Sequence, residues 1–186
     1  MPEDLSRITD QQAEQLCAQL RERLIEVVSQ TGGHLASNLG VVELTVAIHR
    51  VFHTEWDRLV FGVGHQRYCH KILTGRNGAM ETLRSFGGLS GFPKPNESRS
   101  DAFVAGHASN AVSVALGMAR ARTLLGEDYD VLALLGDGAL TGGLSYEGLT
   151  NAGQSGERLI VILNDNGMSI TPNVGSIANY LAHQRL

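Results

Sequence analysis

Residues 131–168 read VLALLGDGALTGGLSYEGLTNAGQSGERLIVILNDNGM, and this stretch decides the fold. Its two apolar runs, Val131–Leu135 and Leu159–Leu163, are short, rich in Val, Ile and Leu, and bounded by turn residues, which is typical of buried parallel strands. Thr141–Gly153 between them is long enough for a crossover helix. The stretch therefore predicts a β-α-β unit within an α/β fold, a mostly parallel sheet flanked by helices.

Both predicted strands end in polar turn residues. Gly136-Asp137-Gly138 follows the first strand and Asn164-Asp165-Asn166 follows the second, and parallel strands of open sheets carry their ligands at this edge. Asp137 offers a carboxylate and Asn166 an amide oxygen, which suit Mg²⁺ bound to a substrate phosphate. Glycine lets a diphosphate approach the backbone, and the N–H groups that open the next helix can bind it. Asp-Gly and Asn-Gly are also common turn dipeptides, but two at neighbouring strand ends favour a site.

The spacing of 29 positions between Asp137 and Asn166 resembles the Mg²⁺–thiamine diphosphate motif of the transketolase superfamily. Five further blocks resemble the 1-deoxy-D-xylulose-5-phosphate synthase family in particular. They are GGHLASNLGVVELTVAIH (32–49), VGHQRYCHKILTGR (63–76), GGLSGFP (87–93), GHAS (106–109) and NDNGMSI (164–170). The resemblance runs from about residue 10 to the end of the sequence.

The resemblance implies a set of site residues for two cofactors, thiamine diphosphate and Mg²⁺. Mg²⁺ would be held by Asp137, Asn166 and the main-chain oxygen of Met168. The residues around the cofactor would be His65, Gly106, His107, Ala108, Gly138, Ala139 and Asn166. The sequence departs from the family pattern twice: Gly62 stands where the family commonly has Asp, and Ala108 where it commonly has Ser.

Three histidines lie in glycine-flanked loops or at strand ends: His34, His65 and His107. A single histidine of this kind is more often solvated or structural, but three at one sheet edge favour proton transfer near neutral pH. Their spacing matches no common zinc motif. By resemblance, His34 and His65 are the catalytic candidates, with His34 the better candidate for moving a proton.

The activity that the resemblance implies is the condensation of pyruvate with D-glyceraldehyde 3-phosphate, with release of CO₂, by a homodimeric enzyme. Two alternatives remain open at this stage. One is another transketolase-type enzyme or subunit that uses the same cofactor site with a different donor. The other is a non-catalytic thiamine diphosphate-binding module.

We expect residues 1–186 to form a single domain, the N-terminal diphosphate- and Mg²⁺-binding domain of a larger enzyme. The pyrimidine-binding and C-terminal domains of the family have no counterpart in this sequence. We therefore expect a fragment whose missing domains belong to the same enzyme, possibly as a separate chain, and which is weakly active or inactive alone.

Composition excludes some classes of partner. The formal net charge is −4 and the calculated pI about 5.9, so there is no basic surface for nucleic acid. No apolar run is long enough to span a membrane and no signal peptide opens the chain, which predicts a cytoplasmic protein. Cys17 and Cys69 are expected to be reduced thiols that pack in a core.

Local patterns predict the remaining elements. A capping box at Thr9–Gln12 opens a helix that Gly32-Gly33 ends, and a polar loop connects it to the next helix. Gly87–Ser100 is rich in Gly, Pro and Ser, which predicts a loop of the kind that often covers an active site. The other predicted elements are a strand at Arg58–Phe61 and helices at Val41–Phe52, Gln66–Leu73, Ala79–Phe86, Val112–Leu125 and Ser176–Gln184.

Overall fold

The structure, a computed structural model, describes residues 4–165, 175, 176, 179, 180 and 183. The chain forms two compact units. Unit 1 comprises Met1–Asp57 and Gly64–Val104, and unit 2 comprises Arg58–Val63 and Ala105–Leu186. The chain thus leaves unit 1 once to form a strand of unit 2, returns, and then completes unit 2.

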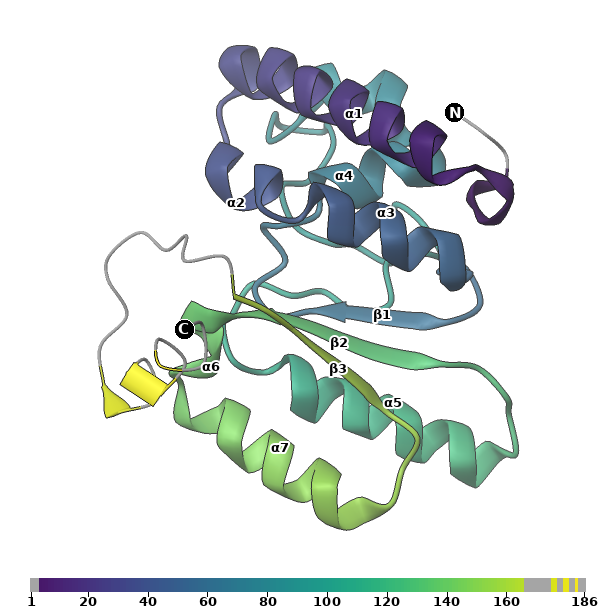
Figure 1. Cartoon of the computed structure of the whole chain (residues 1–186), viewed down its shortest axis with the longest axis vertical. Helices are drawn as coiled ribbons and strands as arrows, with labels where there is room; N and C mark the ends of the chain where they lie inside the picture. Colours follow the sequence, from purple (N-terminus) through teal and green to yellow (C-terminus); the bar gives the residue numbers. More distant parts are fainter. Residues whose placement is uncertain (1–3, 166–174, 177–178, 181–182, 184–186) are drawn as a thin grey trace. The chain divides into compact units, whose positions relative to one another are not determined.

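A parallel sheet forms the centre of unit 2 (Figure 1). Its described strands are β1 (Arg58–Phe61), β2 (Val131–Gly136) and β3 (Ile160–Asn164), in the order β1-β2-β3. Both pairs are parallel, so all three strands end at the same edge. The predicted α/β class with a parallel sheet and flanking helices is confirmed.

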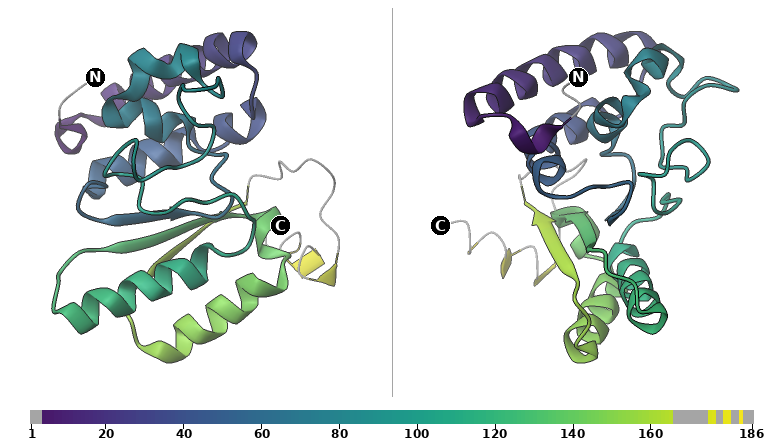
Figure 2. Two further views of the ribbon diagram at one scale, coloured as in Figure 1. Left: turned by 180° about the vertical axis from the view of Figure 1, so that it is seen from behind. Right: turned by 90° about the vertical axis from the view of Figure 1, so that its right-hand side faces the viewer.

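Two helices of unit 2 cover one face of this sheet (Figure 1, Figure 2). They are α5 (Ala111–Leu125) and α7 (Gly143–Ser155), and the short helix α6 (Asp137–Leu140) follows β2 directly. Alternate residues of β2 share one apolar core with the small side chains of α5, because successive residues of a strand point to opposite faces. The core residues from these two elements are Val131, Ala133, Leu135, Ala111, Val112, Ala115 and Ala119. The predicted crossover helix, Thr141–Gly153, is therefore confirmed as α7, and α6 is an additional short helix over residues predicted as a turn.

Strand β3 is not buried, and this part of the prediction is wrong. The first five residues of β2 are buried, whereas Ile160, Val161 and Leu163 of β3 are 36–38% exposed. Within the described residues β3 pairs with β2 alone, and so does β1, whose Leu59, Val60 and Phe61 are buried. The two edge strands differ in cover: Val60 of β1 belongs to an apolar core cluster, whereas no residue of β3 does. A Val/Ile/Leu-rich run shows that a strand can be buried, but not that neighbours cover it.

Unit 1 is built around a long helix, α1 (Asp10–Thr31). Thr9 and Gln12 form the predicted capping box, and Gly32 ends the helix with a φ of 71°. The other helices of this unit are α2 (Leu35–Leu39), α3 (Val42–Val51) and α4 (Tyr68–Lys71), with short helical turns η1 (Leu5–Arg7), η2 (Ile72–Arg76) and η3 (Asn77–Thr82).

Three predictions for unit 1 need correction. The polar loop after α1 contains a helix, α2, and the predicted helices Gln66–Leu73 and Ala79–Phe86 are reduced to α4 and the turns η2 and η3. Gly75, with a φ of 87°, interrupts the helical pattern. The predicted helix Ser176–Gln184 lies largely outside the described residues.

The two cysteines lie in the core of unit 1 as free thiols, as predicted. Burial raises the pKa of Cys69 to about 12, so this thiol is unreactive near neutral pH. Of the helices in the described part of the chain, none has both the length and the apolar character that a membrane crossing requires.

Two acidic residues hold the long loop of unit 1 to its helices. Asp101 accepts hydrogen bonds from Arg67 Nη2 at 3.0 Å and Arg76 Nη1 at 2.9 Å, and Glu97 pairs with Lys71 Nζ at 2.5 Å. Asp101 and Arg67 are at most 1% exposed. Buried charges of this kind are tolerated only when they are paired, so the pairs fix the course of the predicted loop Gly87–Ser100.

A histidine pair extends this buried polar cluster. His49 Nε2 lies 2.9 Å from His70 Nδ1, and His70 Nε2 lies 3.3 Å from Asp101 Oδ1. Burial and the charges of Arg67 and Arg76 lower the pKa of His49 to about 4, and burial also lowers the pKa of His70. Both imidazoles are therefore neutral at pH 7, so one ring nitrogen of the pair can donate and the other accept.

We predict that acid destabilises the protein through His49. Unfolded histidine takes up a proton near pH 6.5 and His49 in the folded protein only near pH 4, so its contribution is complete above pH 6.5 and is lost as the pH falls. At pH 4.5 the loss is about 2 kcal/mol. Urea unfolding at pH 7 and pH 4.5 measures it, and His49→Gln should show a smaller difference between the two pH values.

The control is His53→Gln, which removes an exposed histidine of the same unit. It should keep the full acid destabilisation of the unchanged protein. The same pH dependence in the His49→Gln and His53→Gln variants would contradict the assignment.

Candidate functional site

Asp137 lies at the carboxyl end of β2, where the sequence places it. It is the first residue of α6 and is 4% exposed. In the β2–β3 pair Gly136 lies opposite Asn164. The next residue of each strand end, Asp137 and Asp165, therefore starts from neighbouring positions at one edge of the sheet. The side chain of Asp137 and the start of the Asn-Asp-Asn segment are thereby brought to the same edge of unit 2.

Two of the three predicted Mg²⁺ ligands, Asn166 and Met168, lie outside the described residues. Within the described residues, no three His, Cys, Asp or Glu side chains gather as a metal-binding group. A set of one carboxylate, one amide oxygen and one main-chain oxygen would not form such a group. The donor atoms are all oxygen, which is the chemistry that Mg²⁺ prefers. The residue types of the predicted ligand set therefore fit the metal.

The loop that contains Gly106, His107 and Ala108 is tied to the turn after β2 by Ser109. Ser109 Oγ donates a hydrogen bond to the main-chain oxygen of Ala139 at 2.7 Å. Ser145 of α7 donates to the same oxygen at 2.8 Å. Two segments that the sequence assigns to a diphosphate are thus neighbours within unit 2, although some 30 residues separate them in the chain.

Ser109 adopts a backbone conformation that is unusual for a residue with a side chain. Its φ is 72°, in the left-handed region, and it is buried. Strain of this kind persists where the surrounding structure holds it, and it concentrates at functional sites. Ser109 is not among the predicted site residues, although it is the last residue of the GHAS block, because a lone serine in a sequence does not indicate a buried hydrogen bond.

The same loop leaves space beside its backbone. Gly106, His107 and Ala108 are exposed, and a Cβ atom added to Gly106 would meet nothing within 4 Å. Packing within the protein therefore does not explain the glycine. An open, glycine-containing loop beside the start of a helix is an arrangement that an anion can approach closely.

His34 and His65 are brought together in unit 1. The centres of their rings are 4.9 Å apart and the ring planes are inclined by 53°. His34 is exposed and His65 is half-buried. Burial and the neighbouring His34 lower the pKa of His65, so its imidazole is neutral at pH 7 and can accept a proton. His107, the third predicted histidine, belongs to unit 2.

The hydrogen bonds that hold this pair come from Asn38. Its Nδ2 group donates to the main-chain oxygens of His34 and His65, both at 2.7 Å, and its Oδ1 accepts from the main-chain N–H of Tyr68 at 2.8 Å. Asn38 is 0% exposed. It was visible in the sequence only as one polar residue of a predicted loop.

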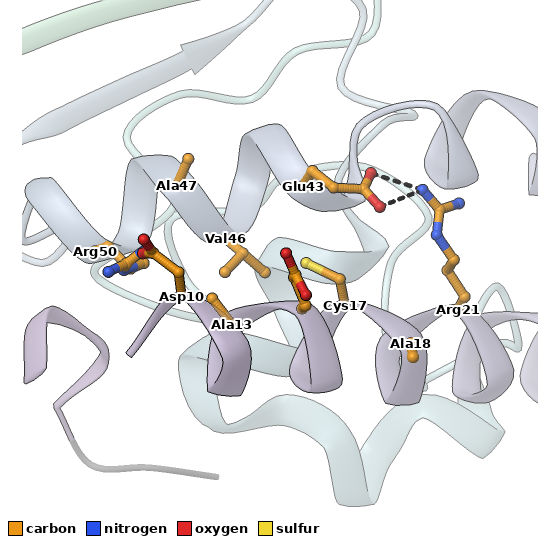
Figure 3. A pocket seen from close by; sticks show the side chains of 10 residues that line it. Asp10, Ala13, Cys17, Ala18, Arg21, Glu43, Val46, Ala47 and Arg50 are labelled. Atoms are coloured by element: carbon orange, nitrogen blue, oxygen red, sulfur yellow. Dashed lines mark hydrogen bonds and ion pairs between the residues drawn. The ribbon is translucent and has the colours of Figure 1, made fainter. Parts of the chain in front are cut away.

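A hollow of about 440 Å³ between α1 and α3 contains none of the predicted site residues (Figure 3). Arg21 donates to both carboxylate oxygens of Glu43 at 2.6 Å, and Arg50 pairs with Asp10 at 2.9 Å. Four of its five charged side chains thus already pair with one another inside the protein, and the fifth is Glu14. We therefore do not place the functional site in this hollow.

Comparison with known proteins agrees with the resemblance in the sequence. A family model described as 1-deoxy-D-xylulose-5-phosphate synthase matches residues 1–186. This chain belongs to the 1-deoxy-D-xylulose-5-phosphate synthase family. Family membership is thus established over the whole sequence.

Proteins named as this synthase are similar to nearly the whole chain. The relative from Desulforudis audaxviator is 58% identical over 182 residues, which cover 98% of this chain and 29% of the relative. The relative from Carboxydothermus hydrogenoformans is 55% identical over 185 residues, 100% of this chain and 30% of the relative. That from Azobacteroides pseudotrichonymphae is 55% identical over 180 residues, 97% of this chain and 28% of the relative. The chain thus spans less than a third of the length of these synthases.

The structure gives a physical context for one departure from the synthase pattern. Gly62 follows β1, and a Cβ atom there would lie 3.0 Å from Leu135 Cβ and 3.1 Å from Leu135 Cα. Its N–H donates to the main-chain oxygen of Leu134 at 2.6 Å. The backbone after β1 therefore runs very close to β2 at this point. Glycine fits there without strain, whereas the Cβ atom of an aspartate would require its neighbours to shift slightly. Ala108, the other departure, is exposed.

We predict that Gly142→Ala destabilises unit 2 of this synthase-family protein. The backbone of Gly142, with φ −80° and ψ 138°, suits any residue, but its Cβ would lie 2.2 Å from Ser109 Oγ and 2.9 Å from Ser109 Cβ. Since Ser109 is held by its hydrogen bond to Ala139, it cannot move without breaking the link between the two loops. The expected loss is about 1–3 kcal/mol in urea unfolding.

The matched control is Gly143→Ala, one residue further along the chain. A Cβ at Gly143 would meet nothing within 4 Å, and alanine favours the helix that begins there. Gly143→Ala should be neutral or slightly stabilising. Equal stability of the two variants would show that the contact with Ser109 does not constrain position 142.

Proposed function

We propose that this chain is the N-terminal cofactor-binding domain of a 1-deoxy-D-xylulose-5-phosphate synthase. The reaction joins pyruvate to D-glyceraldehyde 3-phosphate with loss of CO₂. The cofactors are thiamine diphosphate and Mg²⁺, and the complete enzyme is a homodimer. Membership of the synthase family and the positions of the polar residues at the sheet edge support this proposal.

The observation that carries the proposal is the parallel pairing of β2 with β3. With Gly136 opposite Asn164, the only carboxylate of the Gly-Asp-Gly turn lies at the edge where the Asn-Asp-Asn segment begins. A metal that bridges a diphosphate needs oxygen ligands from two such segments, because each supplies one or two donors and the phosphates supply others. Asp137, Asn166 and the main-chain oxygen of Met168 are the proposed ligands.

The diphosphate of the cofactor would be bound by the two loops that Ser109 links. Gly106, His107 and Ala108 would supply one side of the site, and Gly138 with Ala139 the other. Main-chain N–H groups at the start of a helix and in a tight loop stabilise negative charge without adding a net positive charge to the protein. Asn166 would contact both the metal and the cofactor.

The pair formed by His34 and His65 would serve proton transfer. Thiamine diphosphate supplies a carbanion centre and an electron sink for decarboxylation when it is bound. His34 is the proposed proton carrier, because its side chain is exposed and therefore accessible. His65, which is neutral at pH 7, would accept a hydrogen bond or a proton beside the cofactor.

The rest of the active site would come from the part of the enzyme that this chain does not span. The aligned synthases are more than three times as long as their matched segments. We propose that the longer protein supplies the pyrimidine-binding and C-terminal domains, in the same chain or as a separate fragment. Activity therefore belongs to the complete enzyme, and the 186-residue chain alone would be weakly active or inactive.

We predict that Asp137→Ala in the complete enzyme abolishes Mg²⁺-dependent binding of thiamine diphosphate. Loss of one of the few protein ligands should weaken cofactor affinity by about 100-fold or more, because the carboxylate is the only charged ligand proposed. Calorimetric titration of thiamine diphosphate, with Mg²⁺ and with a chelator, measures the effect.

Asp165→Ala is the matched control, since Asp165 follows the neighbouring strand and is not a proposed ligand. It should retain Mg²⁺-dependent binding within a small factor. Thermal unfolding must show that both variants are folded. Unchanged cofactor affinity in Asp137→Ala would contradict the proposed site.

For His34 we predict a loss of turnover without a comparable loss of cofactor. In the complete enzyme, His34→Ala should lower kcat for CO₂ release from pyruvate by about 100-fold, the usual scale for removing a proton-transfer group. Cofactor affinity should change much less, because His34 is not a proposed ligand. Equal losses in kcat and affinity would count against proton transfer.

A further inference from the structure

The main chains of His34 and His65 are joined by one buried side chain, although 31 residues separate them in sequence. Asn38 Nδ2 donates one hydrogen bond to each of their main-chain oxygens, at 2.7 Å. Both N–H bonds of the amide are therefore used, one for each histidine. The side chain bridges the start of α2 and the segment before α4.

The third hydrogen bond fixes the orientation of this amide. Asn38 Oδ1 accepts from the main-chain N–H of Tyr68 at 2.8 Å. With the amide rotated by half a turn, the oxygen would face two carbonyl oxygens and the NH₂ group would face an N–H. Because each of these contacts would be repulsive, the neighbours permit only one orientation.

Tyr68 supports the same backbone from the other side. Its hydroxyl lies 3.5 Å from the main-chain nitrogen of His34, and a Cβ atom added to Gly33 would lie 2.7 Å from that hydroxyl. Gly33 has a φ of 137°, which other residues rarely adopt. The backbone between the end of α1 and His34 therefore has little conformational freedom. Asn38 determines where this turn lies relative to His65.

We propose that Asn38 is a positioning residue for the pair formed by His34 and His65. By binding both main chains it holds the rings of His34 and His65 at their separation of 4.9 Å. Only the expected effect on kcat rests on the proposed function. The geometric part, that Asn38 sets the His34–His65 separation, does not depend on the reaction.

The side-chain chemistry at position 38 explains why an amide is suited to this task. An aspartate would place a carboxylate against two carbonyl oxygens. An aliphatic residue would leave two carbonyl groups and one N–H without these partners inside the protein, at a cost in stability. Of the uncharged side chains of this length, only an amide offers two donors and one acceptor in a plane.

The test uses the complete enzyme with two uncharged variants, Asn38→Ala and Asn38→Leu. Both remove all three hydrogen bonds, and leucine also fills the space, so the two together separate a cavity from the lost bonds. The matched control is Ser37→Ala, the preceding residue of α2, whose hydroxyl reaches His34 O only at 3.4 Å. Thermal unfolding identifies the variants that are folded.

Two readouts are needed. The first is the kcat for CO₂ release, with the KM for pyruvate and the affinity for thiamine diphosphate. The second is the pKa of His65, from NMR titration of histidine labelled with ¹³C, with resonances assigned by single histidine replacements. The second readout reports on the pair directly and requires no activity.

We expect kcat to fall by about tenfold or more in both Asn38 variants, because small displacements of a catalytic group are costly. KM and cofactor affinity should change little. The pKa of His65 should rise towards its ordinary value, because the ring becomes less buried and His34 moves away. Ser37→Ala should match the unchanged enzyme in every measurement.

Three results would overturn the proposal. An unchanged His65 pKa in the folded Asn38 variants would show that Asn38 does not set the geometry of the pair. A shifted pKa with unchanged kcat would show that the reaction does not use this geometry. Equal falls in kcat and cofactor affinity would show a structural role only. If the unchanged enzyme released no CO₂ from pyruvate, the proposed function would fail, and the titration alone would decide the role of Asn38.

Discussion

Parallel hydrogen bonding between β2 and β3 is the constraint on which the proposed cofactor site depends. Because the two strands run in the same direction, their carboxyl ends reach one edge together, and the register places Gly136 opposite Asn164. A shift of one residue would turn every side chain of a strand to the other face. The buried alternation of β2 against α5 fixes which side chains of β2 face that helix, since Val131, Ala133 and Leu135 share a core with its small residues.

Single buried polar side chains then connect segments that are distant in sequence. Ser109 joins the GHAS loop to the turn after β2, and Asn38 joins the two histidine-bearing segments of unit 1. In both cases a buried polar side chain hydrogen-bonds to main-chain groups of a distant segment.

Local signals in the sequence predicted much of the fold. The capping box at Thr9 and the glycine at position 32 set the ends of α1, because both act through backbone hydrogen bonds and dihedral angles within a few residues. Helix α2 was missed because its five residues include two polar side chains and lie between Gly33 and Gly40, a composition typical of a loop. The burial of β3 was predicted wrongly, since the composition of a strand does not say which other elements will cover it.

The sequence by itself determined the parallel α/β class, the family, and the residue types of the proposed site, because periodicity, turn chemistry and motif spacing are properties of neighbouring residues. Only the tertiary structure decided that His34 and His65 form a pair and that Ser109 links two loops. It also decided that Asn38 and Asp101 are buried among their partners. The physical reason is that burial and hydrogen-bond partners depend on segments tens of residues apart, and no local pattern in the chain specifies which of them will meet.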